Sequence, residues 1–152
     1  MPNYKEELHE LLSTVLKENA SDLHISVGRY PTIRVDGGLV PLLKKEIITP
    51  EVSEGLVKAL TTQEQQMVFH ADREADFSYD FDGKARFRVN IFHQKSFMGA
   101  AMRLIPAKIR TFAELNLPQV LEDFCRRPQG FFLVVGPTGH GKTTTLAAMV
   151  DY

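Results

Sequence analysis

A glycine-rich segment near the end of the chain has the residue types and the spacing best suited to chemistry. Residues 136–143 read GPTGHGKT and fit the pattern G-x-x-x-x-G-K-[ST]. Glycine adopts backbone conformations that a β-carbon forbids, so consecutive N–H groups in such a segment can point into one concavity. An apolar run precedes the segment and a helical pattern follows it, which is the context of a phosphate-binding loop. The sequence therefore predicts a loop that holds the phosphates of a nucleotide.

Two side chains of this loop have specific expected roles. Lys142 would place its charge on the β- and γ-phosphates of ATP, and the Thr143 hydroxyl is the expected ligand of Mg²⁺. Thr144 could add a hydroxyl donor, although one polar turn of helix explains it equally well. The alternative is a glycine-rich turn with an exposed lysine. The predicted binding residues are Gly136, Pro137, Thr138, Gly139, His140, Gly141, Lys142, Thr143 and Thr144.

An ATPase built on such a loop also needs one carboxylate that binds Mg²⁺ and another that activates water. Both normally follow the loop, and only eight residues follow Thr144 in this chain. Asp76 and Asp80 precede the loop, but they alternate with apolar residues and are better explained as the solvated face of a strand. We therefore expect that this chain alone does not hydrolyse ATP.

The composition limits the kinds of partner that the protein can have. Its 152 residues include 18 Lys and Arg against 19 Asp and Glu, for a formal net charge of -1. This balance argues against a basic protein that coats nucleic acid. Apolar runs of about five residues are far shorter than the ~20 that span a bilayer, and no signal peptide is visible. The single Cys125 cannot form an internal disulfide, which favours a reducing cytoplasm.

The periodicity of the first two thirds of the chain predicts an α+β domain with an antiparallel sheet. Helix patterns cover residues 4–19, a segment starting at Thr49-Pro50, and a segment with a Thr62/Gln65 capping box. Strand patterns cover residues 23–27, 32–35, 39–43, 75–81, 85–92 and 97–105. The Asp-Gly pairs at 36–37 and 82–83 predict tight hairpin turns because these residues accept positive φ values.

The pattern changes after this domain. Two short helices interrupted at Pro118 are expected, then a strand over residues 131–135, then a helix from about Lys142. The continuous apolar run at 131–135 is typical of a strand buried on both faces of a parallel sheet. A parallel sheet needs further strands, so we expect a truncated α/β domain. The predicted domains are residues 1–107 and 108–152.

Four segments together resemble a known family. They are SDLH at 21–24, RFRVN at 86–90, RLIP at 103–106 and the loop at 136–143. In this order they resemble the ATPases that drive type II and type IV secretion and type IV pilus assembly. The similarity covers the whole chain and is greatest to pilus retraction (twitching motility) ATPases, because the region before the loop is short. His140 departs from the family, in which a serine is usual at this variable position.

The resemblance implies a PAS-like amino-terminal domain joined to a RecA-like ATPase domain. Family members form rings of six subunits at the cytoplasmic face of the inner membrane, at the base of the pilus. They hydrolyse ATP with Mg²⁺ and remove pilin subunits through contact with an inner-membrane platform protein. The resemblance implies no nucleic acid partner and a membrane contact only through partner proteins.

The resemblance also implies that two arginines of the first domain, Arg88 and Arg103, sense the γ-phosphate and act in catalysis with Lys142. Strand alternation places Arg88 on a polar face, where a guanidinium could bind phosphate oxygens in a bidentate manner. The strand of Arg103 alternates less cleanly. Solvated surface arginines are the alternative. His24 is expected to be a partly exposed structural histidine.

Two other functions remain open at this point. The chain could be a non-catalytic protein–protein interaction module that packs against neighbouring subunits, with the loop as an incomplete vestige. It could also come from the related pilus extension or type II secretion ATPases. The initial Met1 and the short region before the loop favour retraction over both relatives.

Overall fold

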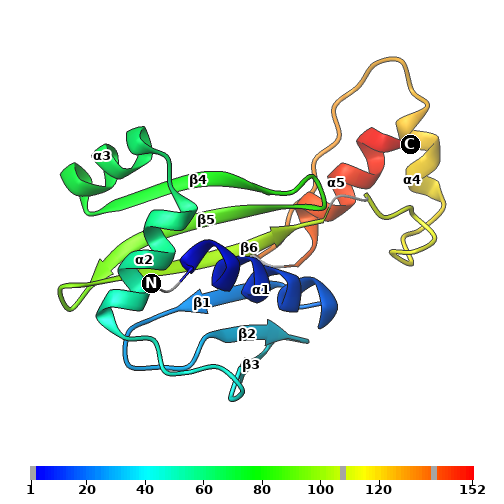
Figure 1. Ribbon diagram of the computed structural model, residues 1–152. Helices are drawn as coiled ribbons and strands as arrows, with labels where there is room; N and C mark the ends of the chain where they lie inside the picture. Colours follow the sequence, from blue (N-terminus) through cyan, green and yellow to red (C-terminus); the bar gives the residue numbers. More distant parts are fainter. Residues whose placement is uncertain (1–2, 107–108, 138–139) are drawn as a thin grey trace. The chain divides into compact units, whose positions relative to one another are not determined.

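The computed structural model describes residues 3–106, 109–137 and 140–152. The chain divides into two compact units, Met1–Ile105 and Pro106–Tyr152. Figure 1 shows the sheet and helices of the first unit and the short helices of the second. In the described residues, no helix is both long and apolar enough to cross a membrane.

The first unit is built on one antiparallel sheet of six strands in the order β3-β2-β1-β6-β5-β4. This arrangement confirms the predicted α+β fold with an antiparallel sheet. The strands are β1 (Asp22–Ile25), β2 (Thr32–Val35), β3 (Gly38–Pro41), β4 (Glu74–Phe81), β5 (Ala85–Gln94) and β6 (Phe97–Ile105).

The predicted hairpin turns form where the sequence accepts positive φ. Asp36 and Gly37 have φ values of 48° and 82° between β2 and β3, and Asp82 and Gly83 have 52° and 66° between β4 and β5. The carboxylate of Asp80 also accepts a hydrogen bond from the Gly83 N–H at 2.8 Å. Asp80 therefore stabilises this turn, and its exposed position on β4 agrees with the predicted solvated strand face.

Three helices complete the first unit: α1 (Tyr4–Lys17), α2 (Pro50–Leu60) and α3 (Gln63–Asp72). Figure 1 shows α1 and α2 over one face of the sheet. The predicted Thr62/Gln65 capping box is present, with both reciprocal hydrogen bonds formed. One apolar stripe of α1 is buried against the inner face of the sheet. Burial of this apolar surface stabilises the packing of the helix on the sheet. The core contains Leu8, Leu11, Leu12, Val15, Leu23, Ile25, Phe87, Val89, Ile91 and Met102.

The second unit contains α4 (Val120–Cys125) and α5 (Lys142–Asp151). The region before Pro118 forms turns instead of the first predicted short helix. Residues 131–135, predicted to be a buried strand, form no strand, and Phe131 and Val135 are 90% and 80% exposed. A strand needs a partner for its backbone groups, and the described part of this unit contains no other strand to supply one.

Candidate functional site

The glycine-rich loop of the second unit leads directly into α5, as its sequence predicts. Gly136 and Gly141 have φ values of 155° and 80°, conformations in which a β-carbon is strained. Gly141 is the N-cap of α5, and its carbonyl accepts the N–H of Thr145 at 2.9 Å. Thr138 and Gly139, also predicted to bind phosphate, lie outside the described residues.

The N-cap residue of α5 supplies no capping side chain. Gly141 has no side chain, so no side-chain hydrogen bond caps the first turn of this helix. The N–H groups of a first turn have no partner within the helix, and with the helix dipole they favour an anion. These amides therefore fit the phosphate chain of a nucleotide.

Lys142 lies over the same loop. Its Nζ donates a hydrogen bond to the carbonyl of Pro137 at 2.7 Å, and its Cδ lies 4.0 Å from the β-carbon position of Gly136. The ammonium group is thus held beside the described start of the loop, at Gly136 and Pro137. Thr143, Thr144 and His140 are exposed. The Thr143 hydroxyl can serve as one ligand of Mg²⁺, but no cluster of three His, Cys, Asp or Glu that could hold a metal occurs among the described residues.

The other two predicted site residues meet in the first unit. Arg88 on β5 and Arg103 on β6 are direct cross-strand partners. Both side chains lie on the sheet face opposite the core, with exposed fractions of 72% and 73%. Each has a carboxylate beside it, because Arg88 Nε lies 3.5 Å from Asp76 and Arg103 Nε lies 2.9 Å from Asp22.

Asp22 contacts two of the arginines on this sheet face. In the strand register it lies between Arg34 on β2 and Arg103 on β6. Its side chain is only 8% exposed, and it contacts Arg34 Nε at 3.3 Å as well as Arg103 Nε at 2.9 Å. The Ser21 hydroxyl donates a third contact at 2.7 Å. One buried carboxylate thus holds two guanidinium groups on the same sheet face.

The protonation of Asp22 follows from these contacts. Burial alone would raise the pKa of its carboxyl group, but the hydrogen bonds from Ser21 and Arg103 and the charges of Arg103 and Arg34 lower the pKa below its usual range. Asp22 is therefore ionised near neutral pH. Burial also lowers the pKa of the neighbouring His24, against the opposing charge of Asp22.

Sequence reasoning did not assign roles to Asp22 or Arg34. The signal was present, because Asp22 alternates with the apolar Leu23, and Arg34 lies between the apolar Ile33 and Val35. What was missing was the pairing of β1 with both β2 and β6, which only the fold supplies.

The order of the motifs and the loop geometry agree with comparisons to known proteins. A profile described as type II/IV secretion system protein matches residues 3–152. The chain belongs to this family. It is 43% identical to the type IV pilus retraction ATPase PilT of Pseudomonas aeruginosa over 96% of this chain and 42% of that protein. It is 37% identical to a twitching motility protein of Neisseria gonorrhoeae over 80% of this chain and 32% of that protein.

A solved structure of the family has the same fold. The crystal structure of the pilus retraction motor PilT with bound ADP matches with a TM-score of 0.85 at 36% identity, over 95% of this chain and 42% of that one. The chain therefore spans less than half the length of these relatives of the secretion family. The predicted family, and within it the similarity to pilus retraction ATPases, is confirmed.

Proposed function

We propose that this chain is the nucleotide-binding amino-terminal portion of a motor ATPase that powers type IV pilus retraction and twitching motility. The observation that carries the proposal is the 43% identity to a pilus retraction ATPase along almost the entire chain. The glycine loop and Lys142 supply a phosphate cradle that suits this function.

The residues of the loop have separate tasks in this proposal. Backbone amides at the start of α5 bind phosphate oxygens, Lys142 balances the charge of the β- and γ-phosphates, and Thr143 contributes one oxygen to Mg²⁺. ATP, when bound, supplies the phosphoryl group whose transfer to water releases the free energy for motion. We further propose that the exposed guanidiniums of Arg88 and Arg103 contact the γ-phosphate, because a planar guanidinium can hold two phosphate oxygens.

The assembly is also part of the proposal. We infer a ring of six full-length subunits at the cytoplasmic face of the inner membrane, in contact with the platform protein of the pilus. The PAS-like and RecA-like domain assignments, with residues 1–107 and 108–152 as their extents, belong to the same proposal.

Nucleotide binding is tested on the full-length protein by isothermal titration with Mg-ATP. The wild type should bind, and Lys142→Ala should lose measurable binding while keeping its thermal unfolding temperature. Equal affinities would reject the loop as the binding site. If the wild type gives no heat either, the chain is better explained as an interaction module.

The cellular role is tested by deleting the gene and complementing the strain with wild-type or Lys142→Ala protein. Loss of a retraction motor should abolish twitching while pili accumulate on the cell surface. Loss of an extension motor would leave the cells without pili, and loss of a secretion motor would leave pili unchanged. Either of these last two results would replace retraction with the related function.

A further inference from the structure

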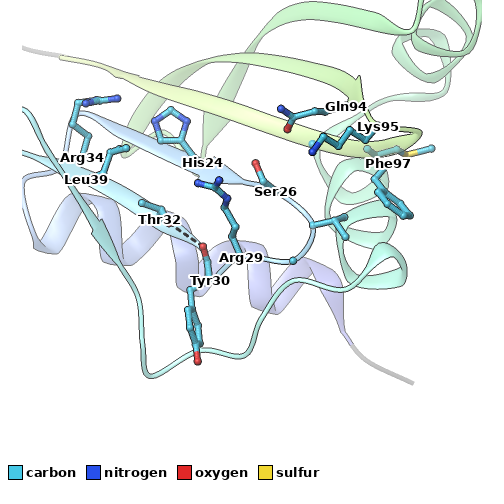
Figure 2. A pocket seen from close by; sticks show the side chains of 14 residues that line it. His24, Ser26, Arg29, Tyr30, Thr32, Arg34, Leu39, Gln94, Lys95 and Phe97 are labelled. Atoms are coloured by element: carbon cyan, nitrogen blue, oxygen red, sulfur yellow. Dashed lines mark hydrogen bonds between the residues drawn. The ribbon is translucent and has the colours of Figure 1, made fainter.

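A groove in the first unit lies next to the hollow that holds the arginine pair, and the proposed ATPase function assigns no role to it. It lies between the loop that follows β1 and the β5–β6 turn, beside β2, and has a volume of about 590 Å³. Figure 2 shows Arg29 entering it from the loop, Lys95 from the turn, and His24 from β1. We call it the basic groove and define it by His24, Ser26, Arg29, Arg34 and Lys95.

The basic groove has an unbalanced charge. Arg29, Arg34 and Lys95 line it, and its lining includes no aspartate or glutamate. Arg34 forms an ion pair with Asp22, which is not part of the groove lining. Among the described residues, Arg29 and Lys95 have no carboxylate within ion-pair distance.

The neighbouring hollow on the same sheet face has both positive and negative side chains in its lining. Its lining combines Arg88 and Arg103 with Asp22, Glu74 and Asp76, so acids of the same chain offset part of its positive charge. The basic groove lacks such partners. Its positive potential is therefore available to an anion from outside the chain.

One wall of the basic groove has an unmet hydrogen-bonding group. The Nε2 atom of His24 is shielded from solvent and has no hydrogen-bond partner among the described residues. Because this nitrogen is shielded, the donors open to a ligand in the groove are those of Arg29 and Lys95.

The loop that carries Arg29 is held in place. The Gly28 N–H donates to the carbonyl of Ile48, and the Ile48 N–H donates to the carbonyl of Arg29, both at 2.9 Å. Ile48 is 2% exposed, so this pair of hydrogen bonds ties the loop to the core. A binding loop that is already ordered loses less conformational entropy when a ligand arrives.

We propose that the basic groove binds a phosphate group, held between the exposed side chains of Arg29 and Lys95. Phosphate fits better than a carboxylate because it has at least three terminal oxygens, so it can accept hydrogen bonds from both Arg29 and Lys95. A guanidinium can bind two of these oxygens, and an ammonium adds a mobile point charge. The source is either free inorganic phosphate or a small organic phosphate, and both present the same group.

The test is two-dimensional ¹H–¹⁵N NMR of the 152-residue chain, titrated separately with inorganic phosphate and with ribose 5-phosphate at constant ionic strength. Saturable shifts should appear at Ser26, Gly28, Arg29 and Lys95 below about 10 mM ligand. They should persist in Lys142→Ala, because the glycine loop is a separate site. Tighter binding of ribose 5-phosphate would identify an organic ligand, and equal affinities would identify free phosphate.

Variants decide whether the groove residues are responsible. The double variant Arg29→Ala/Lys95→Ala should weaken groove binding at least tenfold, whereas Lys44→Ala removes an exposed charge outside the groove and should leave the affinity unchanged. Retained dispersion of the spectrum shows that the variants are folded. Absent or non-saturating groove shifts, or equal affinities in the double variant and the wild type, would overturn the proposal. Shifts in the glycine loop alone would reject the groove and leave the ATPase proposal intact.

Discussion

Arg88 and Arg103 stand directly opposite each other on the neighbouring antiparallel strands β5 and β6. Like charges at directly opposed positions of a sheet repel each other. The structure offsets this repulsion with Asp76 beside Arg88 and the buried Asp22 beside Arg103. The result is a pair of exposed guanidiniums on one surface, each with a carboxylate beside its Nε.

Replacing either arginine should reduce ATP hydrolysis without unfolding the protein. In the full-length protein, Arg88→Ala or Arg103→Ala should lower kcat about 100-fold, the size of effect seen when one charge-stabilising donor is removed. An exposed ion pair contributes at most about 1 kcal/mol, so the Arg88 variant should unfold close to the wild type. Steady-state hydrolysis and thermal unfolding measure the two effects. Arg86→Ala, an exposed arginine two residues away on β5, is the matched control and should keep its activity.

Asp22→Asn should destabilise the first unit by roughly 1–3 kcal/mol at neutral pH. The substitution removes the buried negative charge that interacts with the guanidiniums of Arg34 and Arg103. The pKa of Asp22 is lowered in the folded state, so its contribution is complete above the unfolded-state pKa near 4. It is lost as the pH falls through the lower, folded-state pKa. Urea unfolding of both proteins from pH 7 down to pH 3 should show the difference shrinking below about pH 4.

The control for Asp22 is Asp76→Asn, whose side chain is 49% exposed. Removing this charge should change the free energy of unfolding by less than about 1 kcal/mol. A difference between wild type and Asp22→Asn that stays constant down to pH 3 would contradict the charge-based explanation and indicate a packing effect.

Gly141→Ala should weaken nucleotide binding at least tenfold. Gly141 has φ of 80° at the N-cap of α5, and an alanine there costs about 1–2 kcal/mol in a left-handed conformation, which the loop would relieve by moving the first-turn amides. Titration of the full-length protein with Mg-ATP measures the affinity. Gly38→Ala is the control, because that glycine lacks a positive φ and its added β-carbon would meet only an ordinary contact at 3.5 Å.

Gly55→Ala should destabilise the first unit although alanine favours helices. A β-carbon at Gly55 on α2 would lie 2.4 Å from the ring of Tyr4 on α1, so the ring must move. Overpacking of this kind costs about 1–3 kcal/mol. Adding Tyr4→Ala to Gly55→Ala should cancel part of this loss in a double-mutant cycle of urea unfolding. Additive effects in that cycle would show that the two helices do not meet at this point.

The fold of the first unit was predictable from local signals. The stripe on α1, the Thr62 capping box and the Asp-Gly turns each act within a few residues, and all six strands formed within about two residues of the predicted bounds. The polar face of Arg88 was predictable for the same reason. These signals do not depend on the rest of the chain, because side-chain period and turn chemistry are properties of the local backbone.

Residues 131–135 show the limit of such reasoning. Their apolar run is typical of a buried strand, yet a strand exists only when another strand binds its N–H and C=O groups. In the described part of the second unit no such strand is present, and Leu133 is 67% exposed. The loop after it was predictable in spite of this, because glycine conformations and the start of α5 are local.

The sequence by itself determined the helices and strands of the first unit, its hairpins and the glycine loop that leads into α5, because each depends on residues that are neighbours along the chain. Only the tertiary structure decided that Asp22 holds Arg34 and Arg103 together, that Arg88 opposes Arg103, and that Arg29 and Lys95 line one groove. Pairings between strands distant in sequence create these relationships. The pairing of the strands is set by burial of their apolar faces in one common core, and no local sequence pattern specifies this pairing.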